Sequence, residues 1–189
     1  MQTPVLETVQ GYRLQVAERK HLTHLMQAYN EDPESAQSAL PWLDTNHDIH
    51  RQFRDMLFDI ELKFDDDSIH FWVIFSQEDE FVGMVGLGDE LQLDRSDYNL
   101  GYWVRKSFRR KGIARAAVQR IFEWIESREK STFVEIAVHP RNDAGVATAE
   151  TICIAWHGDR ISEYFGIDVR GRTVPHHLFV VHLPRGEGD

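Results

Sequence analysis

A basic loop in front of a long helical pattern is the stretch whose residue types best suit ligand chemistry. Arg109, Arg110 and Lys111 precede Gly112, and apolar residues at helical spacing begin directly afterwards. The first N–H groups of a helix have no backbone partners, and the helix dipole makes that end positive. A glycine there lets an anion approach the backbone. The residues therefore indicate a pyrophosphate cradle or, equally well on this pattern alone, an ordinary turn with solvated basic side chains.

Other anion-binding functions fit this loop and this chain less well. The loop lacks the pattern Gly-x-x-x-x-Gly-Lys-Ser/Thr, and it has one glycine where a dinucleotide fingerprint needs three. The chain carries a formal net charge of −10, which argues against broad nucleic-acid binding. The negative charge is compatible with a cationic substrate, and it is equally compatible with a role in solubility alone.

The histidines and the single cysteine are the remaining residues with metal-binding or nucleophilic chemistry. His21 and His24 stand three residues apart in a helical segment, whereas His176 and His177 are adjacent in a strand. The spacing of the first pair suits a metal, but the sequence offers no third ligand nearby. We interpret all four as structural or surface residues and expect no metal. Cys153 is interpreted as a small buried apolar residue.

The elements that position the basic loop follow from the spacing of apolar residues. Strands are expected at 12–16, 69–75, 81–87, 98–105 and 132–138, and as a pair within 161–183 around the turn 170–172. Helices are expected at 19–29, 48–64, 111–128 and 143–152. The stretch 38–43 is interpreted as a short apolar turn, and the acidic run 65–67 as a solvated loop. This order predicts a mixed α/β layer architecture.

Length and composition predict a single domain that spans residues 1–189. A chain of 189 residues can bury one sizeable core but is short for two ordinary domains. No apolar run approaches the roughly 20 residues that cross a bilayer, and the first residues do not read as a signal peptide. The one cysteine excludes an intramolecular disulfide. We therefore expect a cytoplasmic protein that does not associate with membranes.

Several short motifs, taken in order, resemble the GNAT acetyltransferase superfamily. Residues 109–114 read Arg-Arg-Lys-Gly-Ile-Ala, which matches the acetyl-CoA signature Arg/Gln-x-x-Gly-x-Gly/Ala. The preceding Gly-Tyr-Trp-Val at 101–104 resembles the strand before that signature in the branch containing the ribosomal-protein N-terminal acetyltransferases. Leu-Pro-Trp-Leu at 40–43, the strand 81–87 and Asn142 resemble further landmarks of that branch. The resemblance implies a mixed, mostly antiparallel central sheet flanked by helices.

The resemblance also implies an activity and a set of cofactor contacts. The implied enzyme is an N-acetyltransferase in which a primary amine directly attacks acetyl-CoA within a ternary complex. The acceptor is expected to be a protein N-terminus or a small amine, and a homodimer is compatible with the branch. The residues expected at the cofactor are Tyr102, Trp103 and Val104 beside the pantetheine arm, Arg109, Arg110, Lys111, Gly112, Ile113 and Ala114 around the pyrophosphate, and Asn142 near the splayed strands.

Two positions depart from that branch and place the catalytic groups in question. Asn99 stands where the branch commonly has a Glu, so this residue is expected to position a water or the amine rather than to accept a proton. Gly145 stands where the branch tends to have a Ser that can donate to the thiolate. The missing Glu and Ser motivate a second hypothesis, in which the chain is a non-catalytic acyl-CoA-binding or regulatory module.

Three other residues are candidates for proton transfer. His157 stands where the branch tends to keep a glutamate, and an imidazole with a pKa near about 6.5 suits proton transfer at neutral pH. Tyr164 is a candidate donor to the thiolate, and Glu90 a candidate for a relay through water. The alternatives are a histidine in a surface turn, a tyrosine packed on the core and a solvated loop acid.

Overall fold

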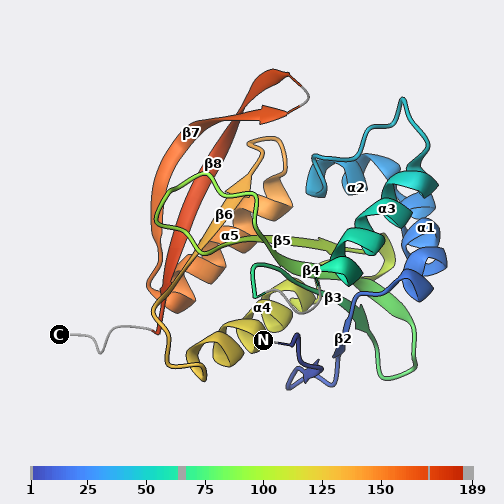
Figure 1. Cartoon of the computed structure of the whole chain (residues 1–189), viewed down its shortest axis with the longest axis horizontal. Coiled ribbons are helices and arrows are strands. Elements are labelled where there is room, and N and C mark those ends of the chain that lie inside the picture. Colours follow the sequence, from blue (N-terminus) through green and yellow to red (C-terminus); the bar gives the residue numbers. More distant parts are fainter. Residues whose placement is uncertain (1, 64–66, 170, 185–189) are drawn as a thin grey trace.

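The computed structural model describes residues 2–63, 67–169 and 171–184, which form one sheet with helices packed on both faces (Figure 1). The helices are α1 (Leu22–Glu31), α2 (Pro33–Ala39), α3 (Ile49–Leu62), α4 (Ile113–Glu126) and α5 (Asp143–Trp156), with short 3₁₀ turns at Arg19–His21 and Lys106–Phe108. The strands are β1 (Leu6–Glu7), β2 (Arg13–Val16), β3 (His70–Phe75), β4 (Phe81–Gly88), β5 (Tyr98–Val104), β6 (Thr132–Val138), β7 (Asp159–Val169) and β8 (Arg172–Leu183). None of the helices in these ranges is both long and apolar enough to cross a membrane.

The sheet is mostly antiparallel, and its single parallel junction among the described strands creates an opening. The strand order is β1-β2-β3-β4-β5-β6-β8-β7, and only β5 and β6 run parallel. These two strands pair at Tyr98 with Val134 and at Asn99 with Glu135. Within the described residues they do not pair with each other beyond these positions, although β5 stays paired with β4 as far as Val104 and β6 with β8 as far as Val138. The strands therefore splay apart towards their carboxyl ends.

Two apolar cores, one on each face, hold the splayed strands in place. One face buries residues of α4 and α5, such as Ile121 and Ile152, against β6 and β8. The other face buries residues of α1 and α3, such as Leu25 and Phe53, against β3 and β4. In Figure 1 helices α1, α2 and α3 lie together on the side of the molecule opposite the β7–β8 hairpin. The open strand ends therefore lie between two rigid layers.

The predicted order of the long elements is confirmed, and the differences concern short or terminal segments. The α2 helix was missed, so interpreting 38–43 as a turn is wrong at Ser38 and Ala39, which belong to the helix. Its signal was present, since the Asp32 side chain caps the helix and Pro33 occupies its first turn. The α5 helix extends to Trp156, beyond its predicted end. Position 64, the first two residues of the acidic run 65–67 and Arg170 lie outside the described residues.

Candidate functional site

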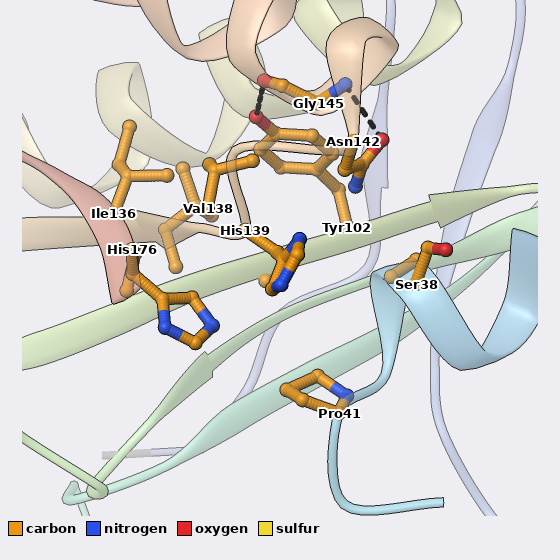
Figure 2. A pocket seen from close by; sticks show the side chains of 13 residues that line it. Ser38, Pro41, Tyr102, Ile136, Val138, His139, Asn142, Gly145 and His176 are labelled. Carbon is orange, nitrogen blue, oxygen red and sulfur yellow. Dashed lines mark hydrogen bonds between the residues drawn. The ribbon is translucent and has the colours of Figure 1, made fainter. Parts of the chain in front are cut away.

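A cavity occupies the gap between β5 and β6 where the two strands separate (Figure 2). Gly101 and Tyr102 of β5 line one side, and residues 136–138 of β6 line the other. The end of α2 and Pro41 close it on one face of the sheet, while Asn142 and Gly145 at the start of α5 close it on the other. A ligand can therefore pass through the sheet here and contact groups on both faces.

The edge of β5 offers unpaired backbone groups to this cavity. The Arg105 N–H donates to the Val82 carbonyl at 2.8 Å, and antiparallel pairing directs every second residue to the same neighbour. The backbone groups of Tyr102 and Val104 therefore point away from β4, towards the gap. Among these groups, the Val104 carbonyl alone has a partner in the part of the chain that the structure describes, the Arg109 Nε at 3.0 Å. An extended amide-containing ligand can pair with the remaining groups as an added strand does.

Trp103 differs from its two neighbours on β5. Its backbone faces Met84 of β4, and its side chain is buried in the core on the α3 side. The indole is stacked on the Phe53 ring, with centroids 6.3 Å apart. Of the three strand residues expected at the cofactor, the structure thus turns Tyr102 and Val104 towards the gap and Trp103 away from it.

The amino end of α4 has the geometry of an anion site. Gly112 is the N-cap residue of the helix, with φ +71°, and no side chain accepts a hydrogen bond from the first N–H groups of the helix as a cap. The first intrahelical bond runs from the Ala116 N–H to the Gly112 carbonyl at 3.0 Å, so the N–H groups of Ile113 and Ala114 precede the ladder. A Cβ at Gly112 would meet nothing within 4 Å, which leaves open space beside these donors. Three of the residues expected at the pyrophosphate therefore form an open, positively polarised helix end.

Arg109 fixes the shape of the basic loop instead of facing the open space. Its guanidinium bonds to the Asp32 carboxylate at 2.7 Å and to the Val104 carbonyl. The hydrogen bond from Arg109 lowers the pKa of Asp32 below its usual value. Arg110 and Lys111 are exposed, and the Lys111 Nζ lies 4.9 Å from the centre of the Phe108 ring. Of the three cations, these two remain accessible to a ligand.

Tyr102 and Asn142 form a hydrogen-bonded turn at the start of α5. The Tyr102 Oη donates to the Gly145 carbonyl at 2.9 Å, and the Gly145 N–H donates to the Asn142 Oδ1 at 3.0 Å (Figure 2). Burial raises the pKa of Tyr102 well above its usual value, so its phenol stays protonated. A Cβ at Gly145 would lie 2.5 Å from the Asn142 amide nitrogen and 2.9 Å from a Val138 methyl carbon. Packing therefore explains why no serine stands at position 145.

Asn99 lies against a fully buried carboxylate on the neighbouring strand. Its Nδ2 donates to the Glu135 Oε1 at 3.1 Å, and Glu135 has no exposed surface. The same carboxylate accepts the backbone N–H groups of Gln92 and Leu93 at 2.7 and 3.0 Å. A glutamate at position 99 would place a second carboxylate beside the buried Glu135, and a buried charge without a partner is costly. An amide at this position instead donates to the carboxylate that β6 provides.

None of the four candidate catalytic residues lines the cavity, and three of them lie away from it. His157 caps the carboxyl end of α5, whose 14 residues place it roughly 21 Å along the helix from the Asn142 end. Tyr164 is 72 % exposed on β7, and its ring lies 6.1 Å from that of His177. Glu90 is exposed in the loop between β4 and β5. The structure thus brings Asn99 close to the splay and leaves His157, Tyr164 and Glu90 away from it.

Two histidines that the sequence interpretation did not select do line the cavity. His139 follows β6, and His176 lies on β8, with ring centroids 5.6 Å apart and planes at 90° (Figure 2). Burial, and then the nearby His176, lower the pKa of His139 below its usual value. The position of His139 directly after a strand, three residues before Asn142, was the available signal. Within the described residues no group of three or more His, Cys, Asp and Glu side chains is arranged to hold a metal.

Comparisons with known proteins agree with this geometry. The family described as acetyltransferase (GNAT) domain matches residues 13–152. No curated protein sequence matches the chain. A Salmonella typhimurium acetyltransferase that modifies the N-terminal serine of ribosomal protein L7/L12 superposes with a TM-score of 0.75 at 17 % identity, over 95 % of this chain and 98 % of that one.

Two further solved structures share the fold and contain coenzyme A. Mycobacterium smegmatis RimJ in complex with a CoA-disulfide has a TM-score of 0.73 at 18 % identity, over 98 % of this chain and 89 % of its own. Spermidine N-acetyltransferase from Vibrio cholerae, in complex with CoA and spermine, has a TM-score of 0.68 at 14 % identity, over 92 % and 96 %. At these identities the similarity establishes a common fold, whose members differ in their acceptors.

Proposed function

Since the chain belongs to the GNAT acetyltransferase family and is an acetyl-CoA-dependent N-acetyltransferase, we propose that its acceptor is the α-amine of a protein N-terminus. The observation that carries the assignment of the site is the splay between β5 and β6, together with the amino end of α4, which has no side-chain cap. Similarity to an acetyltransferase that modifies the N-terminal serine of a ribosomal protein supports a protein acceptor. A small polyamine is the second candidate, because a spermidine acetyltransferase shares the fold.

The residues present fit acetyl-CoA. The N–H groups of Gly112, Ile113 and Ala114 would hold the pyrophosphate, and Arg110 and Lys111 would add positive charge. The backbone edge at Tyr102 and Val104 would pair with the pantetheine amides. Asn142 would contact the pantetheine with its amide nitrogen, which Figure 2 shows directed away from the bond to Gly145. This arrangement would place the thioester in the cavity.

Direct attack by the amine is the reaction that this site supports. The acceptor would enter from the face that carries Pro41 and His176, so that amine and thioester meet inside the splay. An acyl-enzyme route would need a nucleophile, but burial raises the pKa of Cys153 to about 11, and its thiol lies in the core with α5. Asn99 would have a positioning role, because its amide donates a hydrogen bond to the Glu135 carboxylate. His157, Tyr164 and Glu90 stay predictions whose positions give them no contact with this cavity.

We place this reaction in the cytoplasm, with no membrane or nucleic acid as a partner. Acetyl-CoA and newly made protein N-termini are both available there, and the net charge of −10 suits a cationic acceptor. A homodimer is compatible with this function. The reaction needs no metal, because the chemistry requires only positioning and proton transfer.

An acceptor screen with acetyl-CoA tests the proposal. Peptides beginning with serine or alanine, spermidine and an aminoglycoside would be compared, with thiol release and product mass as readouts. We expect acetylation at the peptide α-amine. Turnover with spermidine alone would replace the protein acceptor by a polyamine. Tight acetyl-CoA binding in calorimetry without turnover of any amine would instead support the non-catalytic module.

A further inference from the structure

The two histidines in the cavity differ in the partner of their Nδ1 atom, which is a hydrogen-bond acceptor for His176 and a donor for His139. The His176 Nδ1 lies 3.0 Å from the Val174 carbonyl oxygen, which can only accept a hydrogen bond. The His139 Nδ1 lies 3.1 Å from the Arg141 backbone nitrogen, which can only donate. The bond at one ring nitrogen decides which nitrogen of a neutral imidazole carries the proton. The two rings must therefore be different tautomers.

These partners assign a distinct role to each ring. Neutral His176 carries its proton on Nδ1, so its Nε2 has a free lone pair and can accept a proton. Neutral His139 carries its proton on Nε2 and uses its Nδ1 lone pair for the Arg141 N–H, so it has no acceptor left. His176 is 4 % exposed, which protects its Nε2 from bulk water while the ring still lines the cavity. Of the two, only His176 has the tautomer of a base.

We propose that His176 is the general base that removes a proton from the acceptor amine inside the splay. The inference rests on the proposed function. His139, which packs edge-to-face against His176, is a positioning residue: its ring fixes the plane of the His176 imidazole. This pair lies on the face of the sheet opposite the start of α4, because His176 alternates along β8 with residues that pack against that helix. The base and the pyrophosphate site therefore approach the thioester from opposite faces.

The proton and electron balance of this step is complete without a co-reactant. His176 Nε2 takes one proton from the acceptor ammonium, and the freed lone pair on nitrogen attacks the thioester carbonyl carbon. A C–N bond forms, and the C–S bond breaks as the tetrahedral centre collapses. The second proton on that nitrogen passes to the departing thiolate, which leaves as a thiol. The proton held by His176 then returns to solvent.

The charged and titratable groups around His176 come from β6, the turn that follows it, β7 and β8. His139 and Arg141 belong to the turn after β6, and His177 is its neighbour on β8. Tyr164 of β7 contacts the His177 ring, and Glu135 lies on the same face of β6 as the pair. The α2 end contributes no charge, since Ser38, Ala39 and Pro41 line the cavity there. Burial, the nearby His176 and the cation Arg141 lower the pKa of His139 and so favour its neutral form.

Variants that preserve the local bonds separate catalysis from folding. In His176→Asn the side-chain amide can still donate to the Val174 carbonyl, but the Nε2 base is lost. In His139→Asn the side-chain oxygen can still accept the Arg141 N–H, as in an Asx turn. His177→Gln is the control, because His177 is adjacent in sequence and bonds Arg160 instead of lining the cavity. Turnover would be measured from pH 5.5 to 9 with the best amine from the acceptor screen.

We expect His176→Asn to lower kcat by about 10²–10⁴-fold, the usual contribution of a general base, and to remove the acid limb of the pH profile. His139→Asn should lower kcat less and shift that limb, while His177→Gln should change neither. Acetyl-CoA affinity and the melting temperature should stay near wild type in all three. A His176→Asn enzyme with kcat within a few-fold of wild type and an unchanged limb would overturn the assignment.

Nitrogen NMR of the unsubstituted protein gives a second test that needs neither a variant nor turnover. We expect neutral His176 as the Nδ1–H tautomer and neutral His139 as the Nε2–H tautomer. The reverse tautomer at His176 would overturn the proposal, even if His176→Asn failed to fold. If wild-type protein turned over no amine although it bound acetyl-CoA, the proposed function itself would fail, and this result differs from an active enzyme that tolerates His176→Asn.

Discussion

Gly112 combines a backbone requirement with a ligand requirement. Its φ of +71° is costly for any residue with a Cβ, and the space beside it is open. Gly112→Glu should therefore fold with a modest loss of stability, of about 1–2 kcal/mol for the left-handed backbone, and lose measurable acetyl-CoA binding, because a carboxylate would occupy an anion site. Calorimetric titration with coenzyme A measures this effect.

A matched control for that variant exists in the β7–β8 turn. Gly171 has φ +73°, and a Cβ there also meets nothing within 4 Å. Gly171→Glu therefore carries the same backbone strain and charge but lies away from α4. We expect it to bind coenzyme A like wild type. Equal affinity in both variants would show that the pyrophosphate does not bind beside Gly112.

His157 ends α5, where its backbone conformation favours glycine. The residue adopts φ 53° at the carboxyl cap of α5 and is exposed. Because glycine is preferred at such a position, His157→Gly should raise the free energy of unfolding by up to about 1 kcal/mol and leave turnover within a few-fold of wild type. Chemical denaturation and the pH profile measure both. A lost acid limb in this variant would restore His157 as the base.

At the residue scale, the sequence carries a local signature for the cofactor loop but none for the proton-transfer groups, and both assignments stay predictions. Residues 109–114 are contiguous, so their local signature survives without knowledge of the fold. His139 and His176 are 37 positions apart (176 − 139) and meet only through the pairing of β6 with β8. No local pattern distinguishes such a pair from surface histidines. Asn99 and Gly145 were recognised as departures, but their explanations required their neighbours in space.

At the element scale, Glu135 connects the parallel junction to the loop between β4 and β5. Its carboxylate accepts two backbone N–H groups of that loop as well as the amide of Asn99. A glutamine provides only one oxygen, so Glu135→Gln leaves a buried donor without an acceptor. We expect a loss of about 1–3 kcal/mol in the free energy of unfolding and faster hydrogen exchange at Gln92 and Leu93.

The exposed Glu163 on β7 provides the comparison for this effect. Its side chain is 66 % exposed and lies 3.8 Å from Arg160, and such a surface pair contributes little. Glu163→Gln should leave both the unfolding curve and the exchange of the loop unchanged. If Glu135→Gln behaved in the same way, Glu135 would not anchor the loop, and Asn99 would be available for another role.

The elements missed by sequence analysis are those that depend on tertiary contacts. The β1 strand has two residues and exists because it pairs with β2. The α2 helix has seven residues, and such a short helix is marginal without packing. The long amphipathic helices α3 and α4 were predictable because their apolar stripes are wide. The segment closing the acceptor face of the cavity, α2 with Pro41, was thus the least predictable part of the site.

At the scale of the whole molecule, buried histidines link stability to pH. His70, on β3, is 1 % exposed, and its ring packs against the rings of Tyr98 on β5 and Trp124 on α4. Its Nδ1 lies 2.9 Å from the Thr3 hydroxyl, so it also connects the amino-terminal segment to the sheet. Burial lowers the pKa of His70 despite the nearby Asp67 carboxylate. Burial likewise lowers the pKa of His21 and of His139.

The sign of the effect follows from proton binding in the two states. An unfolded chain binds a proton at each histidine near pH 6.5, whereas the folded chain binds it only at lower pH. Stability is therefore complete above about pH 6.5 and falls as the pH drops towards the folded pKa values. The slope contributed by one histidine reaches about 1.4 kcal/mol per pH unit. The carboxylates of Asp32 and Asp67, whose pKa values are also lowered, act only in more acidic solution, near and below about pH 4.

We therefore expect the free energy of unfolding in urea to decrease between pH 7 and pH 5, and His70→Gln to reduce this dependence. The substitution lowers stability at pH 7, because the ring contacts are lost. It also removes one proton from the difference in proton binding between the unfolded and folded states, which reduces the pH dependence. The exposed His47 is the control, and His47→Gln should keep the wild-type slope. An unchanged slope in His70→Gln would mean that the acid sensitivity arises at His21 or His139, and so on the α1 side or at the cavity between β5 and β6.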